Sequence, residues 1–342
     1  MSTQRKIASL LGVAPSTVSR ALRGDGRISP AMRAKVLEAA NQLQYKPARR
    51  GREPERASAH RPNFLVTFTC LLTRSFFAES VLGIVDAARE RECDITVKAD
   101  VGERFSPAEA ARLLIAEKCD GLILAAFAHV SDEDIRALKA TGKPFVLINR
   151  HAHGACDAVT LDDYSAGFEA VRYLYGLGHR RIAHIHGELS RTSCRERLAG
   201  FRAGAEYFGV YRPELVRSGV WTSSQSHEAR TSICTLLDLP EPPTAIWAHS
   251  DHVAAAVLQE LHRRSLKVPD DVAVLGIDDR QFAAELDLSS FAFRQYDMGV
   301  AALHLLVDLM LGRARSPVRV CIYPELVVRG STEPRQPAPL KG

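Results

Sequence analysis

The chain has 342 residues, 46% of them hydrophobic and 25% charged, which is an ordinary balance for a globular protein of two or three domains. No apolar run approaches the ~20 residues of a transmembrane helix, and polar residues interrupt the N-terminus throughout, so we expect neither a membrane protein nor a secretory signal. The seven cysteines form no CxxC pair, which favours small buried thiols in a reduced cytoplasm over a disulfide framework.

Positive charge is concentrated at the start of the chain. Residues 1–61 hold 13 lysines and arginines against four acids, a net charge of +9, whereas the remainder carries −4. A small basic segment joined to a mildly acidic body is typical of a head that binds nucleic-acid phosphates.

Three short helices are predicted within residues 1–45. The first begins at Thr3 and ends at Gly12, the second begins at Pro15, and the third begins after Ser29. The apolar residues at helical spacing, which should form the inner faces, are Ile7, Ala8, Leu10, Leu11, Val18, Ala21, Leu22, Met32, Val36, Leu37, Ala40 and Leu43. Short helices with a tight turn between the first two indicate a helix-turn-helix.

Residues 46–62 contain three prolines and no large apolar side chain, which predicts a linker. Beyond it, residues 63–342 alternate β-rich runs with helical patterns, which predicts parallel sheets wound with helices in two lobes, with a first break near residues 160–163. The expected strands are 64–69, 94–98, 121–124, 145–148, 181–185, 244–247 and 272–276. The expected helices lie near 78–91, 107–117, 131–140, 163–177, 193–208, 225–237, 250–264 and 297–311.

The segment Gly12–Leu22, GVAPSTVSRAL, resembles the head of the lactose-repressor (LacI/GalR) family. Similar family motifs follow in order: Tyr45-Lys46-Pro47, Phe76-Phe77-Ala78-Glu79, Gly178-His179-Arg180-Arg181, Arg197-Leu198-Ala199-Gly200-Phe201, Val268-Pro269-Asp270-Asp271 and Gly276-Ile277-Asp278-Asp279. The resemblance implies an α/β protein in which an all-α helix-turn-helix head precedes a two-lobed, doubly wound domain like a periplasmic binding protein. It also implies a transcriptional regulator, by default a repressor, that a small effector controls and that dimerises through the two-lobed domain.

The second helix of a helix-turn-helix enters the major groove by its N-terminal half, and here Pro15, Ser16 and Arg20 lie away from the predicted core. Arg20 can form two hydrogen bonds with a guanine edge, worth ~1–3 kcal/mol of base discrimination; a solvated surface arginine is the alternative. Phosphate contacts are predicted for Lys6, Thr17, Ser19 and Arg27.

The linker departs from the family. Relatives usually have a hinge helix, YxPxxxAxxL, whose leucine wedges into the minor groove, whereas this chain has Gly51 and Pro54 at the alanine and leucine positions. Both residues disfavour a helix, so we expect no kinked DNA and a weaker coupling between effector and DNA. Affinity should instead depend steeply on salt, through phosphate contacts of Arg49, Arg50, Arg52 and Arg56.

Doubly wound lobes bind ligands at the carboxyl ends of their strands, in the crevice between the lobes. Residues at such positions, several of them aligned with effector contacts of the family, are Phe76, Phe77, Arg150, His186, Arg197, Trp221, Ser250 and Asp278. An arginine and an aspartate with aromatic neighbours suit a hydroxylated ring, which predicts a sugar, a sugar derivative or a nucleoside-type corepressor. Alternatively, Arg197 and Asp278 only pair structurally across the cleft.

His184, His186 and Glu188 alternate and could share one face of a strand, which permits metal ligands. Because no fourth ligand is evident, we expect residues that line the cleft instead, and we predict neither a metal nor another cofactor. His179 should be structural. Asp162 and Asp163 should cap a helix.

An enzyme is disfavoured, because the chain has no GxSxG, HExxH, Walker loop or GxGxxG after a strand. A periplasmic binding protein would not carry the basic head, and a non-specific DNA-binding protein would need no two-lobed domain. We therefore expect a cytoplasmic homodimer that binds a palindromic double-stranded operator, or else a ligand sensor that is anchored to DNA without sequence preference.

Overall fold

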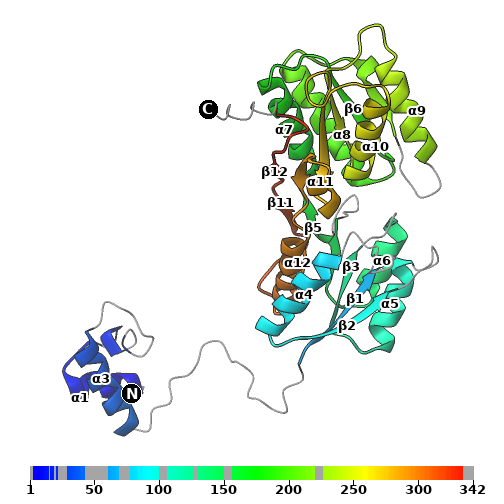
Figure 1. Cartoon of the computed structure of the whole chain (residues 1–342). Helices are drawn as coiled ribbons and strands as arrows, with labels where there is room; N and C mark the ends of the chain where they lie inside the picture. Colours follow the sequence, from blue (N-terminus) through cyan, green and yellow to red (C-terminus); the bar gives the residue numbers. More distant parts are fainter. Residues whose placement is uncertain are drawn as a thin grey trace. The chain divides into compact units, whose positions relative to one another are not determined.

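The computed structural model describes residues 3–14, 16–18, 21, 29–42, 61–68, 78–99, 106–125, 130–149, 156–219 and 226–333. The chain forms two compact units, Met1–His60 and Arg61–Gly342 (Figure 1). The finer division into a head (1–45), a linker (46–62) and a sensing domain (63–342) stays a prediction, because residues 43–60 lie outside the described ones.

The first unit contains α1 (Thr3–Leu11) and α3 (Pro30–Gln42), and residues 16–18 between them are also helical. Helix α1 ends at Gly12, whose φ of +63° suits glycine, as the sequence predicts. Helix α3 begins after Ser29, whose Oγ accepts a hydrogen bond from the backbone N of Met32 at 3.3 Å. Both predicted helix boundaries are therefore confirmed.

One buried cluster holds this unit together, and its members are Ile7, Ala8, Val18, Ala21, Val36, Ala39 and Ala40. The prediction that Leu10 belongs to this core is wrong, because its side chain is 61% exposed. The buried face of α1 is centred between Ile7 and Ala8, with Leu11 beside them. At 3.6 residues per turn, Leu10 lies beyond the edge of that face.

Lobe 1 of the second unit is a parallel sheet in the order β11–β5–β4–β3–β1–β2. Its strands are β1 (Asn63–Phe68), β2 (Asp94–Ala99), β3 (Gly121–Ala125), β4 (Phe145–Ile148), β5 (Asp157–Leu161) and β11 (Arg319–Ile322). Its helices are α4 (Ala78–Glu90), α5 (Pro107–Ala116), α6 (Asp132–Ala140) and α12 (Gln295–Met310). Alternate strand residues face two cores: Phe64 and Val66 pack with α4 and α12, and Leu65 packs with α5 and α6.

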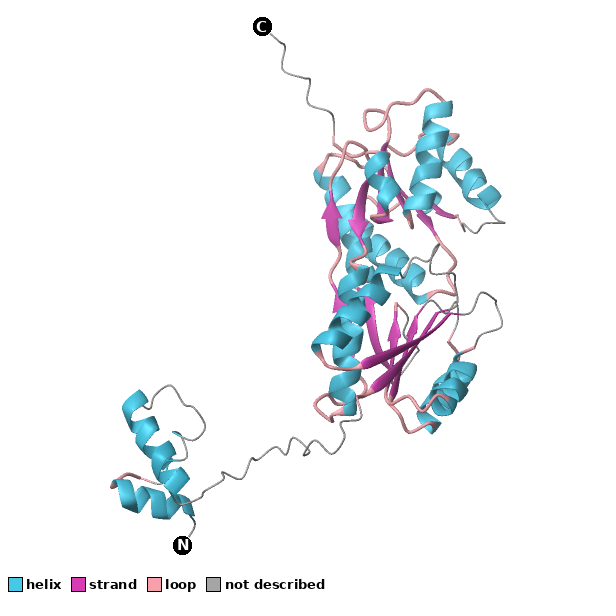
Figure 2. Cartoon of the chain, turned by 60° about the horizontal axis from the view of Figure 1, so that its bottom comes forward, coloured by secondary structure: helices cyan, strands magenta, loops and turns pink. Residues whose placement is uncertain are grey.

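Lobe 2 is a second sheet in the order β12–β10–β9–β8–β6–β7, parallel except for β12. Its strands are β6 (Ile182–His186), β7 (Val216–Ser218), β8 (Ala245–Ala248), β9 (Ala273–Asp278), β10 (Ser289–Ala292) and β12 (Glu325–Val327). Its helices are α7 (Asp163–Gly176), α8 (Thr192–Tyr207), α9 (Ser226–Leu237), α10 (Asp251–Arg263) and α11 (Gln281–Glu285). Helices flank both sheets (Figure 2). No helix in the described part of the chain is long and apolar enough to cross a membrane.

The chain passes between the lobes three times: after β5, between β10 and α12, and between β11 and β12. The predicted break near residues 160–163 is confirmed, and so are all seven predicted strands and eight predicted helices of this unit, within two residues at each end. The sequence did not predict the other two passages, nor β5, β7, β10, β11, β12 and α11. These elements have three to five residues each, and polar residues interrupt their apolar runs, whereas the equally short strands β4 and β8 are wholly apolar.

The cysteines largely follow expectation. Cys93, Cys119, Cys156 and Cys194 are buried, and Cys234 is half-buried. Cys321 is exposed, so the prediction is wrong there, because β11 is an edge strand of its sheet and this residue points to the outer side.

Each lobe contains a pair of helices that approach closely through glycine. Between α7 and α8, a Cβ added to Gly167 would lie within 3 Å of the carbonyl oxygen of Arg197, and one added to Gly200 would meet that of Tyr164. Between α4 and α12, Gly83 and Gly299 make equivalent contacts with backbone carbonyls. A side chain at any of these glycines would force the paired helices apart.

We predict that Gly200→Ala destabilises the protein by about 2 kcal/mol or more, because the new methyl group overlaps the backbone of α7. Urea-induced unfolding followed by circular dichroism measures the loss. Gly176→Ala is the matched control, since a Cβ there has no neighbour within 4 Å and alanine raises helix propensity. Equal stability of the two variants would contradict the close-packing argument.

Candidate functional site

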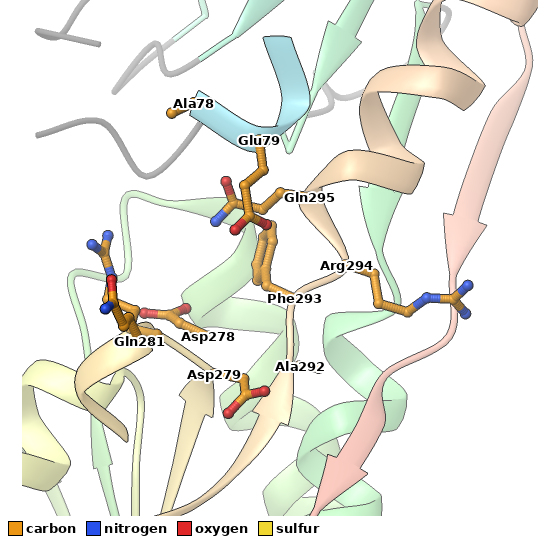
Figure 3. Close-up of a pocket in the computed structure, with 10 residues that line it drawn as sticks. Ala78, Glu79, Asp278, Asp279, Gln281, Ala292, Phe293, Arg294 and Gln295 are labelled. Carbon is orange, nitrogen blue, oxygen red and sulfur yellow. The ribbon is translucent and has the colours of Figure 1, made fainter. Parts of the chain in front are cut away.

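A pocket of about 430 Å³ lies where the two lobes face each other (Figure 3). Its walls come from residues 78–79 at the start of α4 in lobe 1 and residues 278–281 after β9 in lobe 2. The third wall is the passage between β10 and α12, residues 292–295. A site at the carboxyl ends of parallel strands, between two doubly wound lobes, is the expected place for a small ligand.

Asp278 is the last residue of β9, and its side chain forms part of the pocket wall (Figure 3). Burial raises the pKa of its carboxyl group to about 8, although the nearby positive charge of Arg197 opposes the rise. Within the described residues this carboxyl group has no hydrogen bond or ion pair of its own. It is therefore protonated in most molecules at pH 7, so its hydroxyl can donate a hydrogen bond to a ligand while its carbonyl oxygen accepts one.

The loop that carries Asp278 is held from behind by a buried network. Asp251 accepts hydrogen bonds from the backbone N of Arg280 at 2.8 Å and from the hydroxyl of Ser290 at 2.6 Å. The same hydroxyl accepts from the backbone N of Asp279 at 3.1 Å. Asp278 and Asp279 have φ values of +125° and +50°, which cost energy in non-glycine residues and persist only where such contacts enforce them.

Arg197, on α8, is only 5% exposed. Its Nε donates to Oδ1 of Asp163 at 2.7 Å, and its Nη1 donates to the carbonyl oxygen of His249 at 2.7 Å. Burial lowers the pKa of Arg197, but nearby acidic groups, Asp163 first among them, raise it by more, so the guanidinium stays charged. The ion pair of Arg197 is thus made with Asp163 at the lobe passage, and Asp278 acts on it from a longer distance.

Gln295 and Phe293 line the pocket on the passage between β10 and α12 (Figure 3). Gln295 is 8% exposed, and its Oε1 has no hydrogen-bond partner in the described structure. A buried acceptor without a donor costs about 1–3 kcal/mol, which a ligand hydroxyl would recover. The ring of Phe293 lies under the guanidinium of Arg197, with 5.9 Å from Cζ to the ring centroid.

The sequence did not single out Gln295, Phe293 or Glu79 for the site, although all three line the pocket. The first two lie on a passage between lobes that follows the short strand β10, and no periodic pattern revealed that strand. The unpaired amide could be found only from the structure.

Some of the other predicted effector residues lie away from this pocket, and the rest lie outside the described residues. The side chain of His186 bonds through Nδ1 to the carbonyl oxygen of Gly187 at 2.8 Å. Ser250 caps α10, with its Oγ accepting from the backbone N of Val253 at 3.4 Å. Neither residue lines the pocket in this structure. The predicted residues outside the described ones are Phe76, Phe77, Arg150 and Trp221.

The alternating His184, His186 and Glu188 do not converge on one point. His184 is buried and stacks on the ring of Trp247 at 4.3 Å between centroids, and burial lowers its pKa well below 6.5. Glu188 is exposed after the strand and pairs with Arg191 at 3.6 Å. His184 is therefore a neutral core residue, and β6 is an inner strand between β7 and β8.

Two structural predictions near these strands can be checked. The ring of His179 bonds through Nδ1 to Oγ1 of Thr244 at 3.0 Å, as expected of a structural residue. Asp162 caps α7 by accepting from the backbone N of Ser165 at 3.0 Å, as predicted. Asp163 does not cap the helix, because its carboxylate is turned to Arg197.

Few of the predicted DNA-binding residues are described. Ser16 is exposed and Thr17 is half-buried on the helical residues 16–18, and Lys6 lies within α1. The others lie outside the described residues: Pro15, Ser19, Arg20, Arg27, Arg49, Arg50 and Arg52. Their roles stay predictions.

Comparison with known proteins gives two domain matches. Residues 3–48 match the model of "Bacterial regulatory proteins, lacI family", and residues 171–332 match a "Periplasmic binding protein-like domain". The HTH-type transcriptional repressor CytR of Escherichia coli K12 is 30% identical over 335 residues, which cover 97% of this chain and 96% of the relative. The chain belongs to the lacI family.

Further relatives agree with this assignment. The ribose operon repressor of Escherichia coli K12 is 28% identical and is matched over its whole length, covering 97% of this chain. The solved structure named "transcriptional regulator CelR-cellobiose complex" is 29% identical, has a TM-score of 0.69, and covers 97% of this chain and 100% of that one. As a lacI-family member, the chain is a DNA-binding transcriptional regulator and not an enzyme.

The raised pKa of Asp278 makes stability depend on pH. The unfolded chain releases this proton near pH 3.8, but the folded chain holds it until about pH 8, so the stabilisation present at low pH is lost as the pH rises through 8. We predict that Asp278→Asn, which cannot ionise, gains about 1–3 kcal/mol of unfolding free energy relative to the wild type between pH 5 and pH 9.

Urea unfolding of both proteins at each pH measures this difference. Only below about pH 3.8 is the side chain neutral in both the folded and the unfolded wild type, so a comparison there isolates the effect of the amide itself. A wild type and a variant that change in parallel across the range would refute the raised pKa.

Proposed function

We propose that this regulator is a cytoplasmic homodimer that binds a palindromic operator and that a sugar or sugar derivative between its lobes controls its affinity for DNA. The observation that carries the effector assignment is the pocket where Asp278, Gln295 and Phe293 meet. Repression is the expected sign of regulation, as in the relatives named repressors. A nucleoside-type corepressor is the alternative effector.

The chemistry of the pocket supports a hydroxylated ring. Gln295 offers an unpaired acceptor, and Asp278 with a pKa of about 8 can donate or accept near neutral pH. A sugar hydroxyl is itself both donor and acceptor, so it can satisfy either group. Phe293, although almost fully buried, forms an apolar part of the pocket wall beside which the C–H side of such a ring can lie. One relative of similar fold is named as a complex with cellobiose, and another is named after the ribose operon.

Control of DNA binding requires that the effector bind two arrangements of the lobes with different affinity. The pocket has walls from both lobes and from a passage between them, so closing or opening the lobes changes the contacts of a bound ligand. We infer that the two-lobed domain forms the dimer, so that a shift of the lobes changes the spacing of the two heads. Two heads related by a two-fold axis match the symmetry of a palindrome.

The DNA part of the proposal is tested by selection from a randomised duplex pool at moderate salt. We predict that the wild type enriches a palindrome and that Arg20→Ala loses a G·C position within it, because the bidentate guanine contact is removed. Lys35→Ala is the matched control: it removes one positive charge from the exposed side of α3 and should leave the enriched sequence unchanged.

Three outcomes are informative. Loss of the same position in both variants would show that charge, and not base contact, selects the site. If the wild type enriches no sequence and its affinity falls equally steeply with salt for all duplexes, the chain is a ligand sensor anchored to DNA non-specifically. If enrichment appears only after a nucleoside is added, the corepressor alternative is correct.

The effector part is tested by thermal unfolding with a panel that includes cellobiose, D-ribose and common nucleosides. We predict that at least one compound raises the Tm of the wild type and that Asp278→Ala and Gln295→Leu weaken its binding about 10-fold or more, because each removes a polar contact in a desolvated pocket. Asp132→Asn, an exposed acid at the start of α6, is the control and should bind as the wild type does. A ligand whose affinity is the same in all four proteins binds at another site.

A further inference from the structure

Two consecutive residues of α8 bond to different lobes. Arg197 holds Asp163 and the carbonyl oxygen of His249, both in lobe 2. Its neighbour Glu196 accepts two hydrogen bonds from Arg319 on β11, the edge strand of lobe 1, with Nη1···Oε1 at 3.1 Å and Nη2···Oε2 at 2.9 Å. Glu196 and Arg319 thus form an ion pair that joins the two lobes.

Arg319 also bonds to β5, the strand after which the chain leaves lobe 1. The Nε of Arg319 donates to Oγ1 of Thr160 on β5 at 3.0 Å. Three residues later along the chain, Asp163 is held by Arg197. The passage from β5 to α7 is therefore bonded at both ends, by Arg319 at Thr160 and by Arg197 at Asp163. These two bonds are connected through the adjacent residues Glu196 and Arg197 of α8.

We propose that the Glu196–Arg319 pair transmits movements of Arg197 to the sheet of lobe 1. The proposal rests on the proposed function, in which a ligand in the pocket displaces groups around Arg197. A shift of Arg197 moves the second turn of α8, which also carries Glu196. Glu196 then displaces Arg319 on β11, and Arg319 in turn displaces Thr160 on β5. The two residues are positioning residues, since neither lines the pocket.

The geometry distinguishes this pair from an ordinary surface ion pair. The side chains of Glu196 and Arg319 are 26% and 34% exposed, and all three of the described contacts of the guanidinium fix its plane. On the same helix, Arg202 and Glu206 also pair at 2.7 Å, but they are more than half exposed and belong to one helix. Loss of that pair changes nothing between the lobes.

Hydrogen exchange of the full-length chain, read by mass spectrometry, tests the connection without DNA or ligand. Thr160→Val removes the hydroxyl on β5, and Arg197→Lys removes the forked contact on α8. We predict that Thr160→Val raises exchange at residues 192–197 and that Arg197→Lys raises exchange at residues 319–322, each by about 2–30-fold. In a Glu196→Gln background both increases should fall below about 2-fold, because the link is weakened.

Glu206→Gln is the matched control background. In it, Thr160→Val and Arg197→Lys should raise exchange as much as they do in the otherwise wild-type chain. The proposal is overturned if each increase is the same with and without Glu196→Gln, or if neither increase occurs. If Arg197→Lys does not fold, the mild variant Thr160→Val alone decides. A ligand screen that finds no binder would sink the proposed function and leave this exchange result intact.

Discussion

The guanidinium of Arg197 is withdrawn from water, and such a charge costs several kcal/mol unless hydrogen bonds and an opposite charge replace its hydration. Asp163 and the carbonyl oxygen of His249 supply that replacement. Because Asp163 is the first residue of α7, the charge can be satisfied only when α7 and α8 lie close together. Gly167 and Gly200 permit this approach, and Gly167 contacts the backbone of Arg197 itself.

The lobe 1 side of the pocket is built by the same means. Gly83 and Gly299 bring α4 and α12 together, and the N-terminal turns of these helices carry Glu79 and Gln295 to the pocket. In both lobes, helices paired through glycine place polar groups of their first two turns in the region between the lobes. The precision of the site therefore depends on small residues in the helix contacts as much as on the polar residues that face the ligand.

Much of the fold could be predicted from the sequence, because long helices and apolar strands leave strong periodic patterns. The helix end at Gly12 and the helix cap at Ser29 were predicted from local signals, and the structure confirms both. The short strands β5 and β10 were missed, and with β10 the sequence also missed the passage that places Phe293 and Gln295 in the pocket.

The chemistry of the site was predictable only in part. Asp278 ends a clear strand, so its place on the pocket wall could be anticipated, whereas its contact with an effector stays a prediction. Asp163 looked like a helix cap, because local sequence cannot show that Arg197, 34 residues later, needs a buried counter-charge. Side-chain partners that come from distant elements are set by tertiary packing, which leaves no trace in local spacing.

The three passages between the lobes have a consequence for synthesis of the protein. Lobe 1 receives its first five strands by residue 161, but its helix α12 and strand β11 come only between residues 295 and 322. At roughly 5–20 residues per second, a ribosome needs about 10–30 s to make the intervening chain. During that time the apolar face that α12 covers has no partner, while the head is already complete. Lobe 1 is therefore begun before lobe 2 but completed only after most of lobe 2 has been made.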